Sequence, residues 1–310
     1  MFGVRITWPD LPAHVRAAVE ELLGSPVVSA ESQVGGFSPG TADRVVTASG
    51  ERAFVKAVSP GQNPRSAEMA RAEAAVSAVM PGNAPAPRLI GTVDDGYWIA
   101  LILEDVEGRH PRTPWEQDEL DTAVRTLEDL ASALTPCPLP DARPAAVVLG
   151  DDLDGWCRIA ADPPADLDPL YAAHLTDFVA ASDRAVASLT GDTLVHCDIR
   201  ADNMLVRPDG SMVIVDWPSG CAGPRWLDTA LLAMNVLAFG GDGDRLLPPP
   251  APDLVVGVVG YLLDRSRQPP PPGLPTVRAF QRWQADALAP WLRRRMGAAA
   301  HPREPGNSAV

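Results

Sequence analysis

The strongest constraint on this chain is the spacing of three polar side chains in its second half. Asp198 and Asn203 lie five residues apart, and Asp216 follows at the end of a later apolar run. The apolar runs 204–206 and 212–215 flank a Pro-Asp-Gly turn, whose glycine tolerates a positive φ. This pattern predicts a hairpin that brings the three polar side chains together at one end.

These three side chains match the groups that phosphoryl transfer requires. A carboxylate must orient and deprotonate the acceptor hydroxyl, and oxygen ligands must hold Mg²⁺ against the phosphates. Asp198 fits the role of the base, and Asn203 and Asp216 fit the role of the metal ligands. A chance match could explain the loop alone, but it explains the loop, the hairpin and the second Asp together much less well.

Lys56 is the only lysine of a chain with 26 basic residues, and it lies in a run with strand character at 52–58. An ammonium is a compact point charge that can sit on phosphate oxygens, whereas a guanidinium is a wide planar fork. We therefore predict that Lys56 contacts the α- and β-phosphates of a nucleotide. The alternative is a solvated lysine at the edge of a strand.

A glycine-bearing segment upstream of Lys56, residues 33–41, is a candidate phosphate-covering hairpin. Gly36 would expose a backbone N–H, and Ser38 could add its hydroxyl where Pro39 removes a backbone donor. An ordinary hairpin turn explains the same residues nearly as well.

A carboxylate partner for Lys56 is expected on the alanine-rich helical stretch 65–80, which contains Glu68 and Glu73. Five residues correspond to about 140° around a helix, so the two cannot face the same strand. Glu73 lies on the apolar stripe with Met69 and Val76, which favours it as the partner. Glu68 is expected in solvent.

The order of these motifs resembles the aminoglycoside phosphotransferase and choline kinase group, the small-molecule branch of the protein-kinase-like fold. The resemblance covers residues 15–235 and is strongest over 194–230. It implies an α+β, two-lobed fold with a small antiparallel-sheet N-lobe over 1–103, a hinge over 104–108 and a larger helical C-lobe over 109–310.

The resemblance also implies a nucleotide and a metal. ATP, with GTP not excluded, and Mg²⁺ would bind between the lobes, and backbone groups of the hinge around Glu104 and Val106 would contact the adenine. Asp228 would accept hydrogen bonds from backbone N–H groups of the catalytic loop. Arg200 either neutralises the transferring phosphate or satisfies a nearby carboxylate, and the sequence leaves both open.

Charge and cysteine content restrict the remaining functions. The net charge of −14 argues against a nucleic-acid partner, because phosphate-backbone binding needs a clustered basic surface. The longest strongly apolar run, 230–240, is too short to span a bilayer, and no signal peptide is apparent. The cysteines show neither close pairing nor zinc spacing, which favours a reducing, cytoplasmic location; they are Cys137, Cys157, Cys197 and Cys221.

The acceptor is the least defined part of this prediction. Residues 141–170 are acidic and poorly periodic, so they either line a pocket for a cationic aminoglycoside or amino alcohol, or form a solvated loop. Two proline clusters, 248–252 and 269–272, are expected to be surface connectors around a helix over 254–263.

The sequence therefore predicts an ATP-dependent, Mg²⁺-assisted O-phosphotransferase that acts on a small hydroxylated molecule. A catalytically silent relative that binds a nucleotide or metabolite as a sensor is the alternative. The complete set of Lys56, Asp198, Asn203 and Asp216 argues against that alternative.

Overall fold

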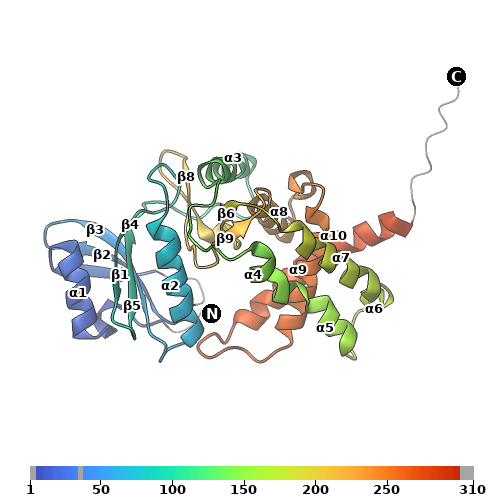
Figure 1. Ribbon diagram of the computed structural model, residues 1–310, viewed down its shortest axis with the longest axis horizontal. Helices are drawn as coiled ribbons and strands as arrows, with labels where there is room; N and C mark the ends of the chain where they lie inside the picture. Colours follow the sequence, from blue (N-terminus) through green and yellow to red (C-terminus); the bar gives the residue numbers. More distant parts are fainter. Residues whose placement is uncertain (1–4, 34–37, 301–310) are drawn as a thin grey trace, which may run out of the picture.

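A computed structural model describes residues 5–33 and 38–300 and confirms the α+β, two-lobed fold (Figure 1). The N-lobe is built on an antiparallel sheet of five strands in the order β1-β2-β3-β5-β4. The strands are β1 (Val27–Ser32), β2 (Thr41–Thr47), β3 (Arg52–Val58), β4 (Leu89–Asp94) and β5 (Ile99–Glu104).

A helix covers each face of this sheet, α1 (Ala13–Leu23) on one side and α2 (Pro64–Ala78) on the other. Because successive strand residues point to opposite faces, Val55 of β3 packs with the α1 cluster and Phe54 with the α2 cluster. Lys56 shares the face of Phe54 and therefore points toward α2. The strand register thus determines which helix can supply its partner.

The C-lobe is mostly helical, with short strand pairs at its junction with the N-lobe (Figure 1). Strand β6 (Thr193–Val195) pairs with β9 (Cys221–Gly223), and β7 (Met204–Val206) pairs with β8 (Met212–Ile214). Gly210 in the β7–β8 turn has φ 82°, as its Pro-Asp-Gly sequence predicts. The helices are α3 (Gln117–Ala133), α4 (Ala145–Leu153), α5 (Gly155–Ala161), α6 (Pro169–Ala173), α7 (Leu175–Ser188), α8 (Leu227–Ala238), α9 (Ala251–Ser266) and α10 (Val277–Ala300).

Trp156 of α5 lies at the centre of the C-lobe core and is fully buried. Its indole N–H donates to the Val256 carbonyl of α9 at 2.7 Å, so the polar end of the ring is satisfied. Tyr171 and Phe178 pack against the ring at centroid distances of 5.5 and 4.6 Å. The ring fits because Gly260 has no side chain, since a Cβ there would lie 2.4 Å from the indole.

Two sequence expectations for the C-lobe are wrong. The segment 141–170 is not a loop, because it contains α4, α5 and the start of α6. These helices are five to nine residues long, which is too short for an apolar stripe to repeat. The proline cluster 248–252 is also more than a connector, since its last residue lies in the first turn of α9, where proline needs no backbone N–H.

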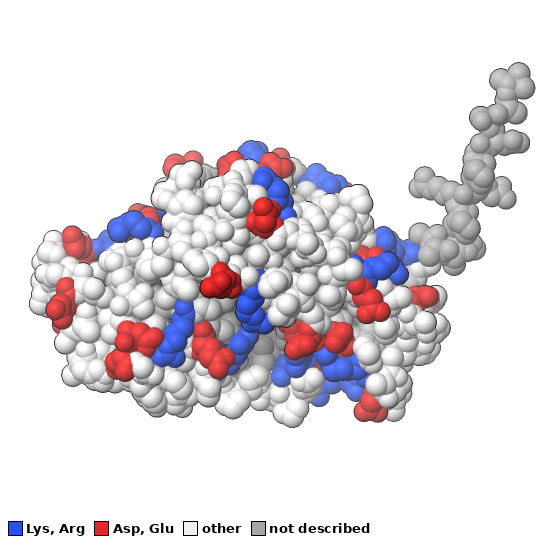
Figure 2. All heavy atoms as spheres, viewed as in Figure 1, with Lys and Arg blue, Asp and Glu red and all other residues white. Residues whose placement is uncertain are grey.

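The surface carries both signs of charge side by side. Figure 2 shows basic and acidic side chains intermingled on the face that includes α4 and α5. Among the residues that the structure describes, none of the helices combines the length and hydropathy that a transmembrane span requires.

The crossing of α5 and α9 predicts a matched pair of substitutions. A Cβ at Gly155 would lie 2.4 Å from the backbone of Gly260, so Gly155→Ala should lower the free energy of unfolding by about 1–3 kcal/mol. Gly150 of α4 has no atom within 4 Å of its Cβ position, so Gly150→Ala should leave that free energy unchanged or raise it by up to about 1 kcal/mol. Urea unfolding followed by circular dichroism compares them, and equal effects would contradict the close crossing.

Candidate functional site

Lys56 joins three elements at the junction of the lobes. Its Nζ lies 2.5 Å from Glu73 Oε2 on α2 and 2.5 Å from Asp216 Oδ1 after β8. Burial alone would lower the pKa of Lys56, but the Asp216 and Glu73 carboxylates outweigh it and raise that pKa, so the ammonium stays charged. Glu68 instead pairs with Arg65 on the exposed face of α2, at 3.4 Å.

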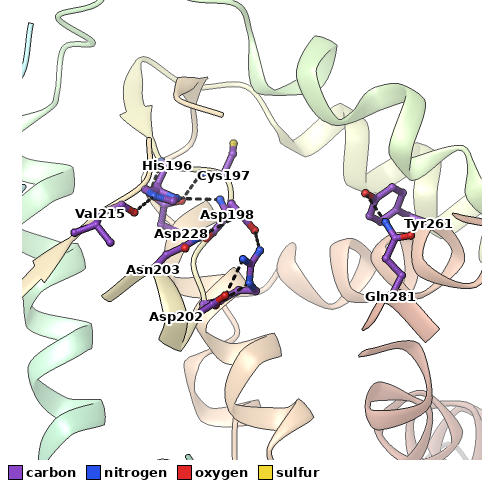
Figure 3. A network of polar contacts seen from close by, with 10 residues as sticks. His196, Cys197, Asp198, Asp202, Asn203, Val215, Asp228, Tyr261 and Gln281 are labelled. Atoms are coloured by element: carbon purple, nitrogen blue, oxygen red, sulfur yellow. Dashed lines mark hydrogen bonds and ion pairs between the residues drawn. The ribbon is translucent and has the colours of Figure 1, made fainter. Parts of the chain in front are cut away.

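The catalytic loop, residues 196–203, is held by buried polar groups rather than by regular structure (Figure 3). Asp228, at the start of α8, accepts hydrogen bonds from the backbone N–H groups of His196 at 2.8 Å and Cys197 at 3.0 Å. The Asp198 N–H donates to His196 Nδ1 at 3.1 Å, so Nε2 carries the proton and donates to the Val215 carbonyl at 3.0 Å. His196 therefore ties the loop to the end of the β7–β8 hairpin, a role that the sequence reading missed.

Two residues of this region have left-handed backbone conformations that are unfavourable for non-glycine residues. Cys197 has φ 64° and Asp216 has φ 69°. Asp198 directly follows the first of these residues, and Asp216 is itself the second.

Asp198 is surrounded by groups that fix its orientation. Arg200 Nη1 donates to Asp198 Oδ1, and Arg200 Nε donates to Asp202 Oδ1 at 2.9 Å. Burial raises the pKa of Asp198, and the Arg200 and His196 side chains partly oppose that rise. Of the two roles that the sequence left open for Arg200, the structure shows it in ion pairs with carboxylates.

Asn203 and Asp216 are brought close by the strand pair that the sequence predicted. The Val215 N–H donates to the Asn203 carbonyl at 3.0 Å, next to the register pair Met204 and Ile214. Asn203 Nδ2 donates to the Asp198 carbonyl at 2.8 Å, which leaves the amide oxygen turned away from Asp198. An amide oxygen and a carboxylate suit Mg²⁺, which usually takes its other ligands from water and phosphates. The described residues contain no cluster of three or more His, Cys, Asp or Glu side chains that would form a metal cage without a substrate.

The expected nucleotide contacts of the N-lobe are described in part. Gly36 lies outside the described residues, and Ser38 Oγ accepts a hydrogen bond from the Gly40 N–H at 3.3 Å. Gly40 itself packs directly on β3, because a Cβ there would lie 2.3 Å from the Ala57 carbonyl oxygen. The backbone of this segment therefore lies against the strand that carries Lys56.

The expected hinge, residues 104–108, is contacted by an arginine of the sheet, which the sequence did not reveal. Arg44 of β2 donates to the Val106 carbonyl at 2.6 Å and pairs with Asp105 at 3.0 Å. Glu104 ends β5 and pairs with Arg207 of the β7–β8 turn at 3.2 Å. A cavity of about 380 Å³ lies between hinge residues 104–107 and turn residues 207–209.

Two cysteines meet beside the catalytic loop. Cys197 Sγ lies 3.1 Å from Cys221 Sγ, and both are buried free thiols. The expectation that the cysteines show no close pairing is therefore wrong for these two, because the β6–β9 pair brings distant residues together. The hydrogen bond with Cys221, followed by burial, raises the pKa of the Cys197 thiol well above its usual value. This thiol stays protonated and unreactive.

The loop between α9 and α10 crosses to the N-lobe and contacts α2 (Figure 1). Asn63 is buried, and its Oδ1 caps α2 by accepting from the Ser66 N–H at 2.9 Å. Its Nδ2 donates to the Pro272 carbonyl at 2.8 Å. One side chain thus stabilises the helix that carries Glu73 and joins it to the helical lobe, and the proline cluster 269–272 is an interlobe contact rather than a free connector.

Residues 34–249 match the model of the phosphotransferase enzyme family, APH. The chain belongs to this family. The match spans Lys56, the loop of residues 196–203 and Asp216, so the sequence-based recognition of the family is confirmed. No match was found among curated proteins.

Several solved structures of phosphotransferases are similar in fold to this chain over most of their length. An aminoglycoside phosphotransferase from Alicyclobacillus acidocaldarius is 14% identical, with a TM-score of 0.55 over 88% of this chain and 91% of that one. Choline kinase LicA from Streptococcus pneumoniae is 13% identical, with a TM-score of 0.58 over 93% and 100%. A thermostable mutant of aminoglycoside phosphotransferase APH(4)-Ia, in complex with ADP and hygromycin B, is 15% identical, with a TM-score of 0.57 over 91% and 98%. At these identities the similarity shows the shared fold.

The double role of Asn63 predicts different effects for two substitutions. Asn63→Ala removes the cap and the contact to Pro272, so it should lower the free energy of unfolding by about 1–2 kcal/mol. Asn63→Ser keeps a capping oxygen and loses only the contact to Pro272, so its loss should be smaller. Thermal and urea unfolding of the two variants test this difference, and equal stability of Asn63→Ala and wild type would contradict the capping role.

Proposed function

We propose that this protein is a Mg²⁺- and ATP-dependent O-phosphotransferase that transfers the γ-phosphoryl group to a hydroxyl of a small molecule. The observation that carries the proposal is the convergence of Lys56, Asp198, Asn203 and Asp216 at one junction between the lobes. Membership of the phosphotransferase family supports it. The nucleotide complexes of fold relatives, with ADP or AMP-PNP, support the choice of cofactor.

In this proposal the Asp198 carboxylate accepts the proton of the acceptor hydroxyl. The acceptor oxygen then bonds to the γ-phosphorus as the bond to the β–γ bridging oxygen breaks, and ADP leaves. Lys56 holds the α- and β-phosphates and Glu73 fixes Lys56. Asn203 and Asp216 hold Mg²⁺, which when bound neutralises developing phosphate charge. The hinge at Glu104 and Val106 and the segment with Gly36 and Ser38 contact the nucleotide.

The proposal is tested by replacing the base. Asp198→Ala should reduce acceptor-dependent ADP release by at least about 100-fold, because the general base is lost, while Mg²⁺-ATP binding persists. The assay is coupled ADP detection with aminoglycosides, amino alcohols and neutral glycosides, beside calorimetric nucleotide titration. Asp183→Ala, an exposed carboxylate on α7, is the matched control and should retain activity.

Undiminished turnover in Asp198→Ala would show that this residue is not the base. Nucleotide binding by wild type without turnover of any acceptor would favour the sensor function instead.

The pairing of Asp198 with Arg200 predicts a pH effect. A base works only when deprotonated, so activity falls as pH drops through the pKa of Asp198, which burial raises and Arg200 lowers. Arg200→Gln removes the neighbouring cation, so the acid limb of the kcat/KM profile should move about one unit or more toward higher pH. Arg225→Gln, whose guanidinium contacts Ser132, is the control and should leave the limb in place. An unshifted limb in Arg200→Gln would contradict the electrostatic coupling.

A further inference from the structure

The region across from Asp198 is formed by α9 and α10. Figure 3 shows Tyr261 of α9 and Gln281 of α10 reaching toward the catalytic loop from the opposite side. Burial raises the pKa of Tyr261 to about 12, and the nearby carboxylates of Asp152 and Asp198 add to that rise. The phenol therefore keeps its proton at physiological pH.

The hydrogen bonds of Tyr261 and Gln281, which we call the α9–α10 wall, leave both side chains as donors to a ligand. Arg278 Nη1 donates to Gln281 Oε1 at 2.9 Å, and because a guanidinium can only donate, the amide nitrogen must face the other way. That nitrogen donates to the Tyr261 hydroxyl oxygen at 3.3 Å. The Tyr261 O–H and the second N–H of Gln281 then have hydrogens to give. A ligand that meets them must present oxygen acceptors, which an ammonium group lacks.

The carboxylates around this wall are held by arginines. Arg265 pairs with Asp152 at 3.2 Å and lies over the Tyr261 ring at 5.9 Å. Arg158 pairs with Asp264 at 2.7 Å. On the facing side, Arg200 pairs with both Asp198 and Asp202. Asp151, exposed on α4, has no side-chain ion pair among the described residues, and its carbonyl accepts from Arg158.

The aspartate of segment 141–170 that lies beside the arginine over the Tyr261 ring, Asp152, is thus already paired with a cation. Two of its aspartates are paired with arginines, Asp152 with Arg265 of α9 and Asp168 with Arg293 of α10 at 2.5 Å, and Arg158 of α5 pairs with Asp264 of α9. A buried or half-buried carboxylate that already has a guanidinium partner gains little from a second cation, and displacing the arginine would leave it without a partner.

Given the phosphotransferase activity proposed above, on which this rests, we infer that the acceptor is an uncharged polyhydroxylated molecule, such as a neutral glycoside, nucleoside or polyol. Its ring or chain oxygens accept hydrogen bonds from Tyr261 and Gln281 while the reacting hydroxyl lies at Asp198. Tyr261, Gln281 and Arg265 are therefore the residues that determine acceptor specificity.

The test compares matched acceptors at pH 8, where an aspartate carboxylate is ionised. ADP release is measured with methyl glycosides, nucleosides and linear polyols, and with the counterpart of each in which one hydroxyl is replaced by an amine, beside kanamycin and hygromycin B. Wild type should show a kcat/KM at least about tenfold higher for the neutral member of a productive pair, as expected when a donor loses its acceptor. A preference for the amine member, or turnover of the aminoglycosides alone, would overturn the inference and leave the phosphotransferase function standing. If acceptors of neither class stimulated ADP release, the phosphotransferase function would be overturned, and the inference with it.

Two variants assign the effect to residues. Tyr261→Phe should raise the KM for the neutral acceptor about tenfold with an unchanged KM for ATP. Arg265→Gln frees Asp152 to meet an ammonium, so it should shift the preference toward the amine member by about tenfold or more. Arg184→Gln, which breaks the Arg184 to Asp253 pair at the other end of α9, is the matched control and should not shift it. An Arg265→Gln preference equal to that of wild type, or a Tyr261→Phe acceptor KM equal to that of wild type, would overturn the specificity assignment.

Discussion

The ion pairs of Lys56 with Glu73 and Asp216 are the interaction on which the arrangement of the site depends. One ammonium joins β3, α2 and the end of the β7–β8 hairpin, so the sheet, the helix and the helical lobe share a single charged contact. Removing Lys56 would leave the buried carboxylate of Glu73 without its cationic partner, which costs more than the ion pair itself contributes. The position of α2 is thus coupled to the position of the hairpin, and Asn63 adds a second link between α2 and the C-lobe through Pro272.

In the loop of residues 196–203, hydrogen bonds rather than ion pairs are decisive, because buried side chains stabilise a backbone conformation that is unfavourable for non-glycine residues. The positive φ values of Cys197 and Asp216 are unfavourable for residues with a side chain. Asp228 and His196 offset this with hydrogen bonds to four backbone groups around the loop. Asp228 lies 31 or 32 residues along the chain from the groups it contacts, so the loop conformation depends on the position of α8 as well as on the loop itself.

The sequence predicts the parts of the site that lie in short motifs. The hairpin, its glycine turn and the position of Lys56 on a strand follow from local patterns, and helical periodicity selects Glu73 over Glu68 as the ion-pair partner that the structure contains. The Arg44 contact to Val106 and the contact between Cys197 and Cys221 do not follow, because strand pairing brings together residues that no local pattern relates. The helices of segment 141–170 were missed because packing on α9, rather than their own periodicity, stabilises them.

Contacts between residues far apart in the sequence also determine the charge around the proposed acceptor position. The net charge of −14 describes the chain as a whole, and at physiological salt a charge is screened beyond about 8 Å. For the acceptor proposed at Tyr261, the groups within that distance matter most, and they include the Arg265–Asp152 ion pair and the Gln281 donor. Arg265 neutralises Asp152 beside Tyr261, and without this guanidinium the carboxylate would be available to a cationic ligand. The composition of a segment therefore predicts its average charge, but the partner that each carboxylate finds in the fold determines whether that charge is available to a ligand.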